Sequence, residues 1–107
     1  MTFSTARKNE NKRIAEQHGC ILTGKTEGID PAHWPLRRSQ GAGWGLLEFV
    51  PLASRFHRAL DQEAPDPALI ALVDGAARLY YRRMLRFYPD CYLGPPERIE
   101  EVRNGGS

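Results

Sequence analysis

The chain has 107 residues, of which 41% are hydrophobic and 26% charged, and its formal net charge is +2. This length and composition fit one ordinary globular domain with a single modest core, and they exclude a wholly disordered chain. The two cysteines give no disulfide framework, and no apolar stretch approaches the roughly 20 residues that a membrane span needs. Because the N-terminal residues show no signal-peptide pattern, we expect a cytoplasmic protein with no membrane partner.

The first half of the chain is expected to form a surface helix, a hairpin and a polar, glycine-rich loop, in that order, at residues 4–18, 20–34 and 36–47. The hairpin joins a short strand at 20–22 to a return strand at 29–34 through a turn that contains Gly24 and Gly28. Pro31 lies inside the return strand, which favours an edge or irregular strand because proline has no N–H to donate.

The second half is expected to be mainly helical, with a short helix at 51–61, a linker at 62–67 and a longer helix over about 67–87. Pro51 would begin the short helix, and Asp66 is a favourable N-cap for the longer one. The longer helix repeats apolar residues at helical spacing, Phe87 among them, so we expect it to buttress the domain. The tail at 90–107 should be partly irregular, with one short helical turn at 96–103.

Arginine dominates the basic residues, since only three of the 15 are lysine. Its planar group suits bidentate contact with phosphate. Four arginines flank the two central histidines and are the candidate DNA-binding residues: Arg37, Arg38, Arg55 and Arg58. An N-terminal basic group and an arginine run at 78–86 have the same chemistry, and all three groups also fit an ordinary solvated surface.

Two of the three histidines stand near carboxylates in the sequence. His57 and Asp61 are four residues apart in the expected helix, so an imidazole and a carboxylate share a face and can approach one cation. Asp30 precedes His33 by three residues and can lie near it on a kinked strand. A general base, a cation and phosphate-binding arginines are what phosphodiester hydrolysis needs. His18, at the end of the first helix, fits a structural role there.

Four motifs follow one another in the centre of the chain: CILTG at 20–24, AHWP at 32–35, a glycine-rich loop, and VPLASRFH at 50–57. In this order, and with Asp61 behind them, they resemble the HNH (His-Me finger) endonuclease module, in its compact phage and prophage version. The resemblance covers residues 20–61. It implies an α+β fold of the ββα-metal type, in which a hairpin and a helix hold one divalent ion. An N-terminal helix and a longer C-terminal helix would flank this core within one domain, 1–107.

The resemblance also implies a role for each candidate residue. His33 would be the general base, and His57 would be a metal ligand on the helix. Asp30 or Asp61 would be a second ligand or would orient a ligand. The cofactor would be a single Mg²⁺ or Mn²⁺ ion, and the partner would be DNA.

The chain departs from the family pattern at three points. Ala32 precedes the base, where many members carry an acid or a histidine. Glu48 replaces the asparagine that orients the base or shapes the loop. Its carboxylate can also bind metal or pair with His33, so Glu48 is a second candidate catalytic residue. Many members hold a structural zinc with four cysteines, whereas the matching residues here are Cys20, Thr23, Ala53 and Phe56. One thiol cannot hold such an ion, so we expect no structural zinc.

Two functions therefore remain open. The first is a DNA endonuclease or nickase that depends on Mg²⁺ or Mn²⁺. The second is a catalytically inactive relative that binds DNA or a protein partner, and the replacement at Glu48 favours it. The sequence also leaves open whether the protein forms a homodimer.

Overall fold

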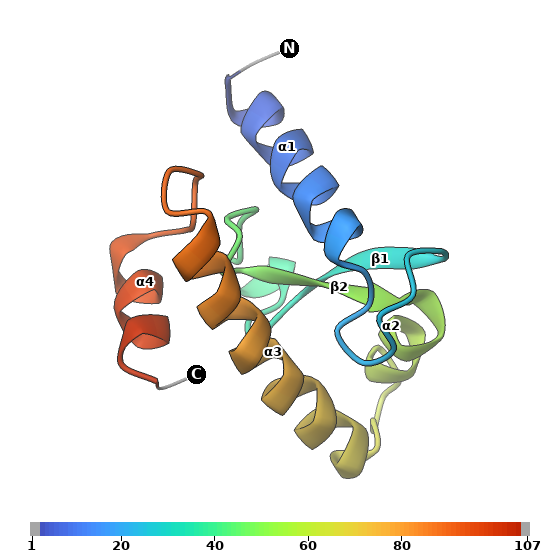
Figure 1. The fold of residues 1–107 in the computed structure, drawn as a ribbon. Helices are drawn as coiled ribbons and strands as arrows, with labels where there is room; N and C mark the ends of the chain where they lie inside the picture. The colour runs from blue at the N-terminus through green and yellow to red at the C-terminus, as the bar shows by residue number, and fades with distance from the viewer. Residues whose placement is uncertain (1–2, 106–107) are drawn as a thin grey trace.

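The computed structural model describes residues 3–105, and a two-stranded antiparallel sheet lies at its centre (Figure 1). The strands are β1 (Ile29–His33) and β2 (Phe49–Ala53). Helix α2 (Ser54–Leu60) follows β2 directly and packs against both strands, and α1 (Phe3–His18) contacts the same two strands. The fold is therefore α+β, with an N-terminal helix, a hairpin and a following helix, as the sequence indicates.

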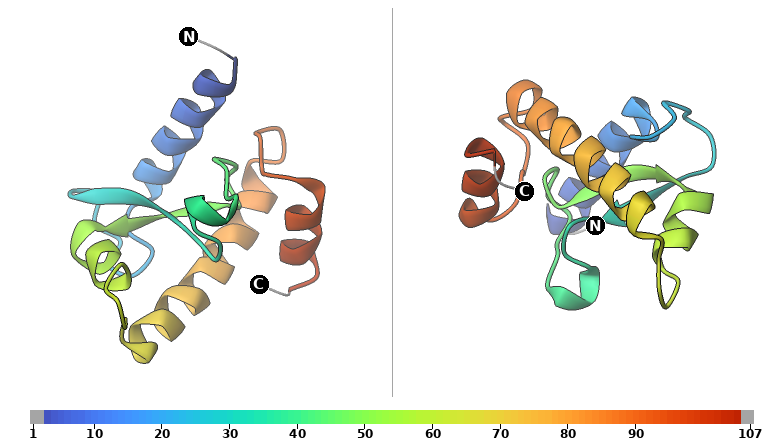
Figure 2. Two further views of the ribbon diagram at one scale, coloured as in Figure 1. Left: turned by 180° about the vertical axis from the view of Figure 1, so that it is seen from behind. Right: turned by 90° about the horizontal axis from the view of Figure 1, so that it is seen from below.

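Two C-terminal helices, α3 (Pro67–Phe87) and α4 (Pro96–Arg103), pack against each other, and both agree with the expected ranges. The side chain of Asp66 accepts a hydrogen bond from the Ala68 N–H at 3.0 Å and so caps α3. Figure 2 shows α3 crossing one side of the sheet, while the loop between the strands, with its short 3-10 turn η1 (Arg38–Gln40), projects from it.

Each strand contains a proline, and Pro31 faces Pro51 across the ladder. The Trp34 N–H donates to the Glu48 carbonyl at 3.1 Å, which makes that pair hydrogen-bonded. Hydrogen-bonded and non-hydrogen-bonded pairs alternate along an antiparallel ladder, and the proline pair lies three positions away. It therefore occupies a position at which the ladder requires no N–H, so both prolines fit within their strands.

The hairpin predicted at 20–34 is wrong, because residues 20–22 form no strand and residues 21–23 are a turn. The Gly24 N–H donates to the Cys20 carbonyl at 2.7 Å, and the Cys20 N–H donates to the Lys25 carbonyl at 2.8 Å. These local bonds use backbone groups that a partner strand would have needed. The strand expected to return to 20–22 pairs instead with residues 49–53, across the 34–48 loop.

The helix predicted at 51–61 begins only at Ser54, because residues 49–53 are the second strand. Pro51 therefore lies in β2 and not in the first turn of a helix. Its carbonyl accepts a hydrogen bond from the Ile21 N–H at 3.0 Å, which ties the turn after α1 to the free edge of β2. His57 remains on the helix, as expected, and Asp61 follows its last residue.

The core lies between the sheet, the 45–48 segment and α3, and its fully buried side chains include Leu46, Leu47, Val50, Leu52, Val73 and Met84. Tyr80 and Tyr81 of α3 are also buried. Phe87, expected in the apolar stripe of this helix, is 61% exposed. Tyr88 packs against the core instead, with its ring 5.8 Å from that of His18.

One buried polar side chain holds α1 to the rest of the molecule. Asn11 is 2% exposed, and its Nδ2 donates to the carbonyls of Trp44 at 2.8 Å and Tyr92 at 3.0 Å. Ile14 and Ala15 are buried on the same helix. Because a buried amide is costly unless it is hydrogen-bonded, this contact fixes α1 against two distant segments.

Candidate functional site

His33 is the last residue of β1, opposite Phe49 in β2. Its ring lies against Trp44 in a T-shaped arrangement, with the ring centroids 4.4 Å apart. The ring atom Nε2 is buried and has no hydrogen-bond partner among the residues that the structure describes. His33 therefore has an imidazole nitrogen that the fold itself does not use.

The pKa of His33 is lowered from its ordinary value of 6.5, chiefly by burial and then by the positive charge of Arg38. The Gly43 carbonyl and the Glu48 carboxylate act in the opposite direction but do not cancel these effects. A lowered pKa keeps the imidazole neutral at physiological pH, and only a neutral imidazole can accept a proton.

The residue after His33 is held by α3. The indole Nε1 of Trp34 donates to Asp74 Oδ1 at 3.2 Å, and the hydroxyl of Tyr81 donates to the Trp34 carbonyl. Two side chains of the long helix thus fix the end of β1, and this gives α3 the buttressing position that the sequence predicts.

His57 lies between two carboxylates, one near each ring nitrogen. Its Nδ1 is 3.1 Å from Asp30 Oδ2, and its Nε2 is 3.7 Å from Asp61 Oδ2. The sequence spacing placed Asp30 beside His33, whereas the structure pairs it with His57. The register explains this: Asp30 lies opposite Leu52, close to the point where β2 passes into α2. The first turns of α2 therefore pass beside the start of β1.

His33 and His57 line the same small cavity, which has a volume of about 30 Å³ and also touches Arg37 and Asp61. This space is large enough for a water molecule. His57 is also one of the groups that lower the pKa of His33, so the two imidazoles lie within electrostatic reach of each other. The structure thus brings together the two histidines that the motifs singled out.

Arg37 closes one side of this cavity. Its Nη1 lies 2.6 Å from Asp61 Oδ1, and its Nη2 donates to the Leu60 carbonyl at 2.9 Å. The 34–48 loop is thereby tied to the end of α2. Arg37 was expected to bind DNA, but much of its charge is already balanced by Asp61.

The other three candidate DNA-binding arginines are exposed. Arg38 donates from Nη1 to the Ala42 carbonyl at 3.0 Å, within its own loop. The guanidinium of Arg55 lies 4.7 Å from the ring centroid of Phe56, and Arg58 is one turn further along α2. Arg38 is the one of the three that reaches the surroundings of His33.

Glu48 shapes the loop that leads to β2. Its Oε2 accepts from the Gly43 N–H at 2.8 Å, and its Oε1 accepts from the Gly45 N–H at 3.0 Å. Gly45 has to be glycine here, because a Cβ would lie 2.4 Å from the carbonyl oxygen of Leu93. These contacts support the role of Glu48 in shaping the loop. Its effect on His33 is electrostatic, because its negative charge acts to raise the pKa of the imidazole.

Three of the four positions that hold zinc in many HNH modules lie together. The Sγ of Cys20 accepts from the Ala53 N–H at 3.3 Å and from the Leu22 N–H at 3.4 Å. Burial raises the pKa of this thiol, but its hydrogen bonds, with the Thr23 side chain first among them, outweigh burial and lower it overall. Phe56, at the fourth position, packs against the core.

Within residues 3–105, no group of three or more His, Cys, Asp or Glu side chains is arranged to hold a metal ion. The cavity that His33 and His57 line contains one possible donor pair, His57 Nε2 and Asp61 Oδ2, which lie 3.7 Å apart. Two donors are too few for a structural metal ion, whose ligands all come from the protein. They are compatible with Mg²⁺ or Mn²⁺, because these ions keep several waters and also bind phosphate oxygens.

Asn11 was not among the candidate residues, and Lys8 and Lys12 were candidates only as part of the N-terminal basic group. The ammonium groups of Lys8 and Lys12 lie 4.8 and 4.5 Å from the ring centroid of Trp44. The N-terminal basic group was visible in the sequence, but its contact with a loop more than thirty residues away was not, because no local pattern indicates it.

Comparisons with protein-family models, with curated proteins and with solved structures find no match for this chain. Over the described residues, none of the helices is both long and apolar enough to cross a lipid bilayer.

Proposed function

We propose that this chain is a metal-dependent endonuclease or nickase of the HNH type, which hydrolyses phosphodiester bonds in DNA. The observation that carries the proposal is the small cavity that His33 and His57 share with Asp61. A candidate base and a candidate ligand pair meet there from β1 and α2, the arrangement that a ββα-metal site requires.

His33 acts as the general base. Its Nε2 has no protein partner, and its lowered pKa keeps it unprotonated near neutral pH. It accepts a proton from a water molecule, whose oxygen forms the new bond to phosphorus while the bond to the leaving oxygen breaks.

His57, through Nε2, and Asp61, through Oδ2, are the residues that would hold the cation. A divalent ion at this position supplies charge neutralisation for the phosphate and the leaving oxygen. Asp30 accepts the hydrogen bond of His57 Nδ1–H and so directs the Nε2 lone pair toward Asp61. Of the two roles left open for the aspartates, Asp61 is thus the ligand and Asp30 the positioning residue.

Two observations favour an alternative, a catalytically inactive module that binds DNA or a protein. Asp61 is already bound by Arg37 at 2.6 Å, and Nε2 of His33 is buried. Cation binding in an active enzyme would have to compete with Arg37, and water would have to reach Nε2. Neither condition applies to a module that only binds.

A plasmid-nicking assay with Mg²⁺, Mn²⁺ or EDTA distinguishes the two functions. The proposal expects nicking with at least one of the ions, none in EDTA, and a loss of about 10²–10⁴-fold in His33→Ala. His18→Ala is the matched control, because His18 lies away from the cavity and bonds to the hydroxyl of Tyr88 at 3.1 Å. Equal, background-level signals from wild type and His33→Ala with every ion would leave only the binding module.

A further inference from the structure

A second and larger hollow, of about 480 Å³, lies between α1 and the loop that carries Trp44. Basic and aromatic side chains line it, with Arg7 and Lys8 on α1, Arg38 on the loop and Tyr92 on the segment after α3. We call this hollow the α1 groove. It is distinct from the cavity that His33 and His57 share.

The α1 groove is built into the fold, because Asn11 joins its three walls. This buried residue of α1 bonds to the backbone of both Trp44 and Tyr92. Lys8 and Lys12 are four residues apart on the same helix, so both reach the rim beside Trp44. The positions of the cations and rings are thus set before any partner binds.

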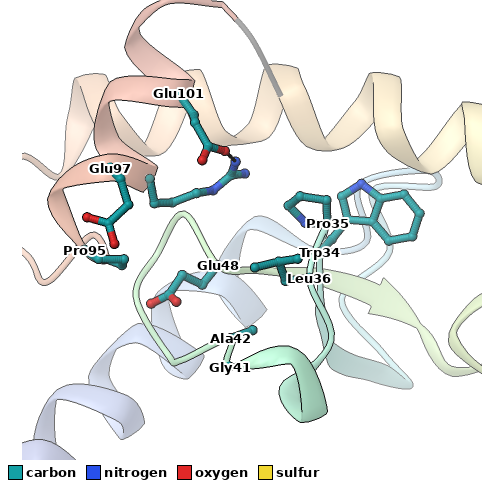
Figure 3. Close-up of a pocket in the computed structure, with 10 residues that line it drawn as sticks. Trp34, Pro35, Leu36, Gly41, Ala42, Glu48, Pro95, Glu97 and Glu101 are labelled. Carbon is teal, nitrogen blue, oxygen red and sulfur yellow. Dashed lines mark hydrogen bonds and ion pairs between the residues drawn. The ribbon is translucent and has the colours of Figure 1, made fainter.

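The charge of the groove is positive and locally unbalanced. Among the ion pairs of residues 3–105, none neutralises Lys8, Lys12 or Arg38. The other side of the same loop has the opposite character. A pocket of about 200 Å³ lies there, lined by Glu48, Glu97 and Glu101 and by one cation, Arg98. Figure 3 shows its acidic side chains, of which Glu101 is paired with Arg98 at 3.0 Å. A polyanion is therefore attracted to the α1 groove and repelled from the pocket behind the loop.

The groove also offers aromatic rings, which a duplex would not need. The side chain of Tyr92 is 42% exposed, and the guanidinium of Arg7 lies 5.6 Å from its ring centroid. Cations beside exposed rings are the combination that binds single strands, because unpaired bases have free faces to stack. In a duplex those faces are already covered by neighbouring base pairs.

The groove borders His33 through the side chain of Trp44. Trp44 lines the groove and touches the His33 ring, and Arg38 and Gly43 both line the groove and act on the pKa of His33. A strand lying in the groove would thus be separated from the candidate base by the Trp44 side chain alone.

We propose that the α1 groove binds a single-stranded segment of nucleic acid, with phosphates on Lys8, Lys12 and Arg38 and one base stacked on Tyr92. The delivery of this strand to His33 rests on the proposed nuclease function, whereas the binding itself does not. The preferred substrate would then be single-stranded DNA, or a duplex with an unpaired segment.

The test is the binding of a labelled oligonucleotide of about 15 nucleotides, followed by fluorescence anisotropy in EDTA over a range of salt concentrations. The single strand should bind more tightly than the matched duplex. Lys8→Gln with Lys12→Gln should reduce the slope of log K against log salt by about 1.4, or about 0.7 for each lost phosphate contact. The control, Arg82→Gln with Arg86→Gln, removes the same charge from α3 and should leave the slope unchanged.

Tyr92 separates stacking from charge. Tyr92→Ala should weaken single-strand binding by about 5- to 140-fold, and Tyr92→Phe should keep most of the affinity, because stacking needs the ring and not the hydroxyl. Equal binding of duplex and single strand, full affinity in Tyr92→Ala, or a slope that changes only in the α3 variant would overturn the proposal. Single-strand binding without nicking in the presence of any ion would support the groove proposal and contradict the proposed nuclease function. Nicking of duplex plasmid without single-strand binding would contradict the groove proposal and support the nuclease function.

Discussion

Asp30 and His57 are 27 positions apart in the chain, yet Oδ2 of Asp30 lies 3.1 Å from Nδ1 of His57. A hydrogen bond at Nδ1 determines which nitrogen carries the proton and so leaves Nε2 with the lone pair that a cation needs. The contact joins the first strand to the helix after the second strand. It is the most direct structural support for a ligand role of His57.

The first prediction concerns this contact. Asp30→Ala should weaken Mn²⁺ binding by about 10- to 100-fold, because His57 loses the partner that orients it. Asp30→Asn should lose less Mn²⁺ affinity, since its amide oxygen can still accept a hydrogen bond from His57 Nδ1–H. Mn²⁺ titration followed by electron paramagnetic resonance measures this without activity. Asp90→Ala, in the exposed turn after α3, is the control, and an unchanged affinity in Asp30→Ala would contradict the role.

The second prediction concerns the pKa of His33. Arg38 is the second-largest cause of its lowering, so Arg38→Gln should raise the pKa toward 6.5. Glu48→Gln should lower it further, because the carboxylate acts in the opposite direction. An NMR titration of the His33 ring protons follows both changes, and His33→Ala identifies the signal. A shift of the same sign in both variants would be inconsistent with this electrostatic account.

The same pKa sets the pH dependence of activity and of stability. The base form of His33 should be lost only below pH 6.5, so activity should be level above that pH and fall as the pH drops through the lowered pKa. Between the lowered pKa and 6.5, the unfolded chain binds more protons at this site than the folded chain. The contribution of His33 to the free energy of unfolding should therefore decrease as the pH falls through this window. Activity that keeps rising steadily from pH 7 to 9 would point to a different base.

The third prediction concerns the loop. Glu48→Ala leaves the N–H groups of Gly43 and Gly45 without their acceptor, and it should lower the free energy of unfolding by about 1–3 kcal/mol. Nicking should fall as well, because this loop holds Trp44 against His33. Glu97→Ala, an exposed carboxylate behind the same loop, is the matched control in urea unfolding. Equal stability of the two variants would show that the Glu48 contacts do not order the loop.

The fourth prediction concerns the anchor of α1. Asn11→Ala removes two buried hydrogen bonds, so it should cost about 1–3 kcal/mol of stability. The Tyr92 carbonyl keeps its bond from the Leu46 N–H, whereas the Trp44 carbonyl loses the side-chain donor. Gln17→Ala, on the exposed side of the same helix, should have almost no effect. Urea unfolding measures both. If the two variants lose the same stability, Asn11 does not fix α1 to the loop.

Local chemistry accounts for the elements that were predicted correctly. Asp66, Pro67 and Pro89 mark the ends of α3, and an apolar repeat fills it, so this helix could be predicted in full. His33 and His57 line one cavity, as their motifs predict, but the roles assigned to them stay predictions.

The elements that were missed depend on contacts between distant segments. Residues 20–22 have a strand-like composition, but the bonds around Gly24 close them into a turn, and β1 pairs instead with β2. Pro51 has the sequence features of a helix start. In the structure it lies opposite Pro31, at a position where neither residue needs to donate a hydrogen bond. The two bonds of Asn11 to distant carbonyls leave no sequence pattern at all.

The central claim is that His33 and His57 act differently on one shared site, and the metal dependence of their alanine variants tests it most directly. His33→Ala should bind Mn²⁺ as tightly as wild type and lose about 10²–10⁴-fold in nicking rate at every Mn²⁺ concentration. His57→Ala should bind Mn²⁺ about 10- to 100-fold more weakly, so part of its activity should return at high Mn²⁺. Equal losses in both variants that no Mn²⁺ concentration restores, or full activity in either one, would contradict the account.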